Sequence, residues 1–179
     1  LIKIVQDLIM KYNLNMFVDR SSPVFNLFRP AVKIGFTCGA FDLLHAGHAL
    51  MLEECKEHCD WLIVGVQSDP SVDRDYKNKP VQSYEERQIM VKSIKWVDEV
   101  VTYDTEEDLY NLLADLKKNK IIDVRIIGAD WKEKRFTGDD LGIPVVYNSR
   151  DHEYSTSELR QRIAAVEYLK RDGNLSIIK

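Results

Sequence analysis

Two histidines three residues apart, His45 and His48, are the residues of this sequence best suited to chemistry on phosphate groups. Imidazole rings donate hydrogen bonds, so they can stabilise the negative charge that grows on phosphate oxygens during transfer. Gly47 stands between them, and its lack of a side chain would let a phosphate approach the backbone. The first N–H groups of a helix lack partners and attract anions. The pair therefore predicts a triphosphate site at a helix start, where the protein positions groups and stabilises charge without a covalent nucleophile. A pair of capping or surface histidines is the alternative.

A charged loop over residues 73–80 is the second candidate. Its Lys77 and Lys79 could close over a polyphosphate, because the loop follows a predicted strand that ends on the same face as the histidines. A solvated surface loop is the alternative, since most charged runs are exposed. Arg87 is predicted to be exposed in the first turn of a helix, where a cation opposes the helix dipole and therefore hints at another use.

Two further groups follow later strands. Residues 128–131, Gly-Ala-Asp-Trp, end one strand, and their carboxylate and indole could hold a nucleobase by hydrogen bonding and ring contact. A plain turn with a buried tryptophan explains the same residues equally well. Ser155, Thr156 and Ser157 open a helix where hydroxyls could meet an anion, and Arg150 before them would add a planar cationic fork. Simple N-capping by Ser155 is compatible with that role.

Short apolar runs alternate with helical patterns from residue 32 onwards, and these elements must position the candidates. Residues 61–66 are a continuous apolar run, which is typical of a parallel strand covered on both faces. Ser83 and Glu86 have the spacing of a capping box at a helix start. We predict strands over 32–38, 61–66, 98–103, 123–127 and 144–147, and helices over 46–58, 84–95, 106–118 and 156–170. The pattern predicts an α/β fold, an open and mostly parallel sheet with helices on both faces and ligands beyond the carboxyl ends of its strands.

Composition places the chain among ordinary globular proteins. It has 179 residues, 45% of them apolar, and a net charge of −4, which argues against a protein that coats nucleic acid. No apolar run reaches the about 20 residues of a membrane span, and the first residues do not resemble a signal peptide, so a cytoplasmic location is expected. An amphipathic stripe over 1–14 predicts that 1–31 form a helical extension and connector. The working domain is predicted over 32–170, with a tail over 171–179.

The three cysteines are few and odd in number, which favours a reducing compartment. Cys55, His58 and Cys59 could suggest a zinc site. A closed zinc site needs a fourth ligand, and none lies nearby in the sequence. We therefore predict no metal site built from protein side chains.

The candidate groups together resemble a known family. Residues 39–48, Gly-Ala-Phe-Asp-Leu-Leu-His-Ala-Gly-His, are similar to the signature of the cytidylyltransferase-like nucleotidyltransferases. Residues 128–131 and 150–157 resemble the second and third signatures of that family. The resemblance runs from about Val32 to about Val166 and is nearest to the glycerol-3-phosphate cytidylyltransferases.

The resemblance implies a Rossmann-like fold, a homodimer and an enzyme that transfers CMP from CTP to a small phosphorylated alcohol. Glycerol 3-phosphate is the expected acceptor, and a CDP-alcohol and pyrophosphate are the expected products. Mg²⁺ is expected to accompany CTP, with phosphates and water as most of its ligands. The resemblance implies catalytic roles for His45, His48, Lys79 and Arg150. It implies acceptor-binding roles for Lys77, Lys79 and Arg87. The residues for which it implies nucleotide binding are Gly39, Ala40, Phe41, His45, Gly47, His48, Gly128, Asp130, Trp131, Arg150, Ser155, Thr156 and Ser157.

The third signature departs from the family pattern. Asp151 stands where the family usually has Thr, and Glu153-Tyr154 replace Gly-Ile, which puts two acids beside a triphosphate unless they face away. The departures motivate the second of two alternatives to the CTP reaction. One is an adenylyltransferase of the same superfamily that acts on a flavin, heptose or pantetheine phosphate. The other is a nucleotide-binding module without catalysis.

Overall fold

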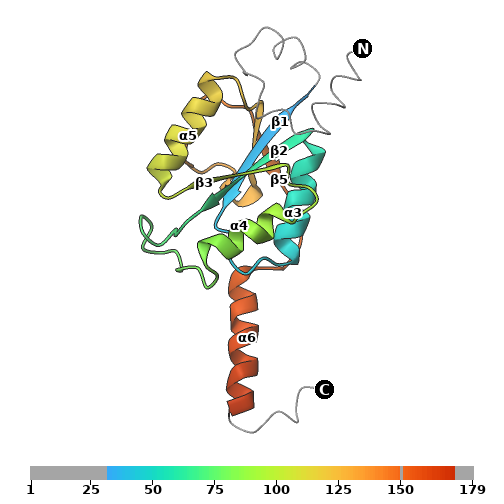
Figure 1. The fold of residues 1–179 in the computed structure, drawn as a ribbon, viewed down its shortest axis with the longest axis vertical. Helices are drawn as coiled ribbons and strands as arrows, with labels where there is room; N and C mark the ends of the chain where they lie inside the picture. Colours follow the sequence, from blue (N-terminus) through green and yellow to red (C-terminus); the bar gives the residue numbers. More distant parts are fainter. Residues whose placement is uncertain (1–31, 150, 172–179) are drawn as a thin grey trace.

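A computed structural model of the chain describes residues 32–149 and 151–171 and contains a parallel sheet flanked by helices (Figure 1). The predicted extension 1–31, Arg150 and residues 172–179 lie outside the described residues. No helix of the described ranges is long and apolar enough to cross a membrane.

The sheet has five strands in the order β3-β2-β1-β4-β5, all parallel, which confirms the predicted α/β, Rossmann-like class. The chain runs from β1 outward to β3 on one side, then returns to place β4 on the other side of β1. The strands are β1 (Ile34–Gly39), β2 (Trp61–Gln67), β3 (Glu99–Tyr103), β4 (Val124–Gly128) and β5 (Val145–Asn148), and the helices are α3 (Ala46–Glu57), α4 (Tyr84–Lys92), α5 (Glu106–Lys118) and α6 (Thr156–Arg171). A short 3-10 turn, η3 (Ala129–Trp131), follows β4.

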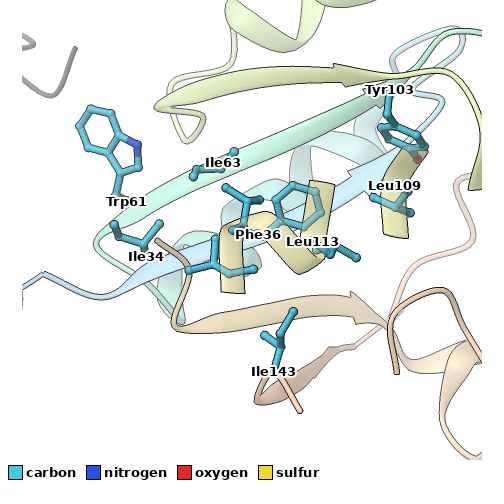
Figure 2. Packing of buried hydrophobic residues seen from close by; sticks show 10 residues of the cluster. Ile34, Phe36, Trp61, Ile63, Tyr103, Leu109, Leu113 and Ile143 are labelled. Carbon is cyan, nitrogen blue, oxygen red and sulfur yellow. The ribbon is translucent and has the colours of Figure 1, made fainter. Parts of the chain in front are cut away.

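Apolar residues cover both faces of the sheet, because successive side chains of a strand point to opposite sides. Every residue of β2 is buried. On one face the sheet packs against Leu109 and Leu113 of α5, and Figure 2 shows this cluster around Phe36 and Ile63. On the other face the apolar cluster includes residues of α3 and α4. The continuous apolar run predicted at 61–66 therefore reflects two packed faces.

Helix starts follow the predicted caps. The Oγ of Ser83 accepts a hydrogen bond from the Glu86 N–H at 3.2 Å, and the Glu86 carboxylate accepts one from the Ser83 N–H at 2.6 Å. The α5 start repeats this box with Thr105 and Asp108. Helix α4 ends at Lys92, three residues before the predicted end, because the chain turns after Ser93 toward β3. These local signals give α3 to α6 their starting points, and the site lies at two of them.

Helix α6 leaves the body of the domain after its first turn (Figure 1). No residue of this helix is buried, and Ile163 and Tyr168 on its outer turns are exposed. Only the start of α6 is therefore in a position to contribute to a site at the sheet.

Candidate active site

The site lies where the strand order reverses, between β1 and β4. Ligands of open parallel sheets bind beyond the carboxyl ends of the strands at such a point. Two cavities occupy this edge of the domain, one of about 210 Å³ and one of about 730 Å³. Gly128, the last residue of β4, lines both of them. The two cavities therefore share the end of β4 as part of their walls.

The smaller cavity is built on the two predicted histidines. His45 is the N-cap of α3, and its Nδ1 accepts a hydrogen bond from the Gly47 N–H at 3.1 Å. The Nδ1 of His48 in turn accepts one from the His45 N–H at 3.3 Å, so the two side chains form a reciprocal capping box. The ring centroids are 4.0 Å apart. Because each Nδ1 accepts a backbone N–H, a neutral ring carries its proton on Nε2, which is the form that donates to an anion.

The start of α6 closes the same cavity. The Nε2 of His45 lies 3.2 Å from the Oγ1 of Thr156, and this hydroxyl donates to the Asp42 carbonyl at 3.3 Å. Ser155 caps α6 by accepting the Glu158 N–H at 3.1 Å. The N-termini of α3 and α6 therefore meet at one small cavity. Two positive helix ends and their capping side chains make this a place for an anion.

A third imidazole, which the sequence reasoning did not single out, reaches this cavity. His152 lines it, and the Nδ1 of His152 is buried without a hydrogen-bond partner among the described residues. A Cβ added at Gly47 would lie 2.7 Å from the Cε1 of His152 and 3.0 Å from the Tyr154 carbonyl. Position 47 therefore has no room for a side chain, because His152 and the Tyr154 carbonyl lie beside it. The approach of a phosphate to this backbone stays a prediction.

The two unexpected acids of the third signature do not face the cavity. Asp151 and Glu153 are both exposed. The wall that this segment contributes consists of His152, Tyr154, Ser155 and Thr156. Neither acid therefore contributes to the cavity wall, where the sequence suggested a charge conflict with a triphosphate.

Asp42 organises the loops around the cavities. Its Oδ1 accepts the N–H groups of Val81 and Gln82 at 2.9 and 3.0 Å, and its Oδ2 accepts a hydrogen bond from Arg160 of α6 at 2.5 Å. Arg160 also donates to the Lys79 carbonyl at 2.8 Å. Burial alone would raise the pKa of Asp42, but these donors outweigh it and hold the pKa below its usual range. One carboxylate thus joins three segments.

The backbone beside Asp42 is strained. Phe41 and Leu43 have φ values of 51° and 48°, a region that residues with side chains rarely adopt. Such strain persists only where the surroundings hold it, and here the buried carboxylate between the two residues provides the anchor. Phe41 lies behind the histidines, with its ring centroid 5.5 Å from that of His48.

Arg87 differs from the sequence prediction, and the expected exposed first-turn position is wrong. Its side chain is 1% exposed. The guanidinium donates to the carbonyls of Ala40 and Gln67, at 2.6 Å each, and to the carbonyl of Ser68. Arg87 therefore ties the end of β1 to the end of β2. Its acceptor-binding role was predicted from the resemblance, and the structure directs its donors to backbone carbonyls.

The other predicted residues divide between the two cavities. The smaller cavity is lined by His45, Gly47, His48, Gly128, Asp130, Ser155 and Thr156. The larger cavity is lined by Gly39, Ala40, Lys77, Gly128 and Trp131. Lys79 and Ser157 are exposed and line neither cavity, and Arg150 lies outside the described residues.

The larger cavity contains buried charge that the sequence reasoning missed. Arg125 of β4 is 3% exposed and lines the cavity together with Arg74, Glu106 and Tyr103. The signal was present, because Arg125 stands between the apolar residues Val124 and Ile126 of the strand predicted over 123–127. A volume of about 730 Å³ is within the range of small-molecule sites.

The described residues contain no group of three or more His, Cys, Asp or Glu side chains placed to hold a metal ion. Side chains in these ranges therefore do not form a cage for Mg²⁺. A divalent cation that enters with a nucleotide would rely on phosphates and water for its ligands.

Comparison with known proteins identifies the family. The profile of the Cytidylyltransferase-like family matches residues 36–162. The bifunctional protein HldE of Campylobacter jejuni is 39% identical over 132 residues, and HldE of Helicobacter pylori is 37% identical over 143 residues. These matches cover 73% and 79% of this chain but only 28% and 29% of the relatives. The chain therefore spans less than a third of the length of these curated proteins.

A solved structure with the same fold is a bifunctional NMN adenylyltransferase/ADP ribose pyrophosphatase from Francisella tularensis, complexed with AMP and a manganese ion. Its TM-score is 0.51 at 15% identity, over 75% of this chain and 42% of the other. This likeness concerns the fold alone. The chain belongs to the cytidylyltransferase-like family, as the match over residues 36–162 shows, and it has a nucleotidyltransferase fold.

Proposed function

We propose that this chain transfers a nucleoside monophosphate from a nucleoside triphosphate to a phosphorylated sugar, with ATP as donor and a heptose phosphate as the first acceptor to test. The observation that carries the proposal is the meeting of the α3 and α6 N-termini at a cavity lined by His45, His48 and His152. Helix N-termini and imidazole donors at one point suit the triphosphate of a nucleotide.

The reaction follows from this arrangement. An oxygen of the acceptor phosphate forms a bond to the α-phosphorus of the nucleotide. The bond from that phosphorus to the oxygen bridging to the β-phosphate breaks, and pyrophosphate leaves with the electron pair. A phosphate monoester is largely a dianion at neutral pH, so no base is needed to remove a proton. The histidines and the helix start stabilise the charge on the transferring and leaving oxygens, and Mg²⁺ supplies further neutralisation when bound with the nucleotide.

The larger cavity is the proposed acceptor site. It shares Gly128 with the smaller cavity, so an acceptor phosphate near that strand end would face the nucleotide. Lys77 lines the larger cavity and would neutralise this phosphate. The side chains of Tyr103, Tyr110 and Trp131 add hydroxyl and ring surfaces of the kind that bind sugars.

The choice of donor and acceptor rests on the relatives. Similarity to HldE proteins favours adenylyl transfer to a heptose phosphate over transfer of CMP to glycerol 3-phosphate. The second candidate is the CTP reaction expected from the sequence, and the description of the matching family, Cytidylyltransferase-like, favours it. The alternative of a module without catalysis loses its main motive, because Asp151 and Glu153 lie outside the cavity wall.

Pyrophosphate release tests the proposal directly. The chain would be incubated with Mg²⁺ and either ATP or CTP, each paired with heptose 1-phosphate or glycerol 3-phosphate. We expect release with ATP and the heptose phosphate. Release only with CTP and glycerol 3-phosphate would replace our proposal by the second candidate, and no release from any pair would refute both for this chain.

A variant pair links release to the site. His48→Ala should lower turnover by at least about 100-fold, because it removes a donor to the transferring phosphate. His58 at the opposite end of α3 is the matched control, and His58→Ala should retain turnover. Equal losses in both variants would show that the effect comes from the helix and not from the cavity. Assembly into a homodimer stays a prediction, which light scattering would test.

A further inference from the structure

The larger cavity holds a buried arginine in a position that the fold reserves for apolar residues. Arg125 pairs in the sheet with Phe36 of β1 and Val145 of β5. Its two neighbours along β4, Val124 and Ile126, belong to the apolar cluster on the opposite face. Arg125 itself is 3% exposed. A permanent charge thus lies at the level of the sheet, at the floor of the cavity.

Few groups satisfy this guanidinium. One terminal nitrogen donates to the Thr137 carbonyl, and the guanidinium carbon lies 5.1 Å from the Phe136 ring centroid. The Nε of Arg125 is buried without a hydrogen-bond partner, and no described carboxylate lies within 4.0 Å of the side chain. The Nε of the other buried arginine, Arg87, is also buried without a partner, but its two terminal nitrogens make three bonds to backbone carbonyls, against one for Arg125.

The acids nearby are already engaged. Glu106 pairs with Arg74 at 2.9 Å and accepts a hydrogen bond from the Thr137 hydroxyl. Asp139 pairs with Arg135 at 2.7 Å. The charge of Arg125 is therefore not matched by either carboxylate.

The thiol beside Arg125 does not supply the missing charge. Burial raises the pKa of the Cys38 thiol, although the charge of Arg125 and a side-chain hydrogen bond with it act in the opposite direction, so this partner of Arg125 stays neutral at physiological pH. The Tyr103 phenol next to it is also neutral, because burial raises its pKa. A buried charge without a counter-ion is costly, and proteins keep such groups where a ligand completes them.

We propose that Arg125 binds a second anionic group of the acceptor, so that the natural acceptor is a phosphorylated sugar carrying a further phosphate or carboxylate. This inference rests on the proposed function for the first phosphate, which faces the nucleotide. The planar fork of a guanidinium matches the two oxygens of either group. A neutral sugar would leave the charge of Arg125 unmatched, which makes the second anion a determinant of specificity.

Binding of matched ligands tests the inference without any transfer step. Calorimetry would compare glucose 1-phosphate, glucose 1,6-bisphosphate and glucuronate 1-phosphate on the wild-type chain without nucleotide. We expect at least one of the two doubly anionic ligands to bind ten times more tightly than the monophosphate, and the comparison between them identifies phosphate or carboxylate. Equal affinities for all three would overturn the inference.

Substitution assigns the preference to Arg125. In Arg125→Met the preference should fall below twofold while monophosphate binding is retained. Arg135→Met is the control, because Arg135 lines the same cavity but has an 88% exposed side chain that pairs with Asp139. A preference that survives in Arg125→Met, or that disappears equally in Arg135→Met, contradicts the assignment.

Thermal unfolding separates a ligand-binding arginine from a structural one. Replacing a buried and unmatched charge by methionine should leave the melting temperature unchanged or raise it. A clear drop would mean that Arg125 mainly supports the loop at Thr137, and would count against our inference. Arg125→Lys, which keeps the charge and loses the fork, should fold and show an intermediate preference.

The two proposals can fail separately. An Arg125-dependent preference without pyrophosphate release from any acceptor keeps the anion site and rejects the transfer reaction. Release from a monophosphate with no Arg125-dependent preference keeps the transfer reaction and rejects the second anion.

Discussion

The bond between Asp42 and Arg160 allows a sharp test of how the site is held together. The two backbone N–H groups of Val81 and Gln82 bond the Oδ1 of Asp42, whereas Arg160 bonds the Oδ2. Asp42→Asn can keep the amide oxygen toward the backbone donors and places an NH₂ group against the guanidinium. The substitution therefore removes the contact with Arg160 and leaves the loop contacts in place.

The structure sets the size of the effect. The Asp42 side chain is 8% exposed, and that of Arg160 is 28% exposed. Charge-assisted hydrogen bonds contribute about 1.5–3 kcal/mol, and exposed pairs contribute about 0–1 kcal/mol. Because one partner is buried and the other is partly solvated, we expect a coupling energy of about 2 kcal/mol between the two side chains.

Urea unfolding of a double-mutant cycle measures this energy. Wild type, Asp42→Asn, Arg160→Met and the double variant would be compared at pH 7. Arg162→Met is the control on the same helix, since Arg162 is 4.0 Å from Glu158 and both side chains are at least half exposed. It should change the free energy of unfolding by less than about 0.5 kcal/mol. A coupling energy below that value, or equal effects of Arg160→Met and Arg162→Met, would refute the reasoning.

Three further predictions concern single positions. The pKa of Asp42 is lowered in the folded state, so its stabilising contribution is present at neutral pH and is lost as the pH falls below about 4. The difference in unfolding free energy between wild type and Asp42→Asn should therefore shrink below that pH. Gly47→Ala should weaken nucleotide binding in calorimetry, because the added Cβ would clash with His152 and Tyr154 and displace them from the cavity wall. The melting temperature is measured beside it, and unchanged binding would contradict this prediction. Arg87→Met should cost about 3 kcal/mol in urea unfolding, because it leaves three carbonyls without their donor, and a neutral effect would show that water replaces it.

The fold could be predicted because its signals are local. The apolar run at 61–66 indicates two covered faces, and the caps at Ser83 and Thr105 set the helix starts. Helix α5 begins and ends at the predicted residues, 106 and 118. Strand bounds shifted by a residue or two, since the pairing partner decides where a strand ends.

The site was less predictable because its interactions join distant segments. The prediction for Arg87 used only the periodicity of its own helix, whereas its partners are carbonyls at the ends of β1 and β2. His45 acts as an N-cap, which histidine rarely does, and this capping role was the structural alternative to the phosphate chemistry predicted for the histidine pair. The sequence contained a signal for Arg125, an arginine among apolar strand residues, but its place in the larger cavity depends on strand register, and the place of His152 depends on the path of its loop.

Helix α6 has a consequence for how the protein opens locally. Its first turn contributes Thr156 to the smaller cavity and Arg160 to the Asp42 network, while its outer turns project from the body (Figure 1). The outer turns depend on intrahelical bonds and weak surface pairs such as Lys170 with Glu167. Isolated helices of this length are marginal in water, so amide protons of the outer turns should exchange quickly and those of the first turn slowly. Exchange rates along a single helix would then mark where the folded domain stops.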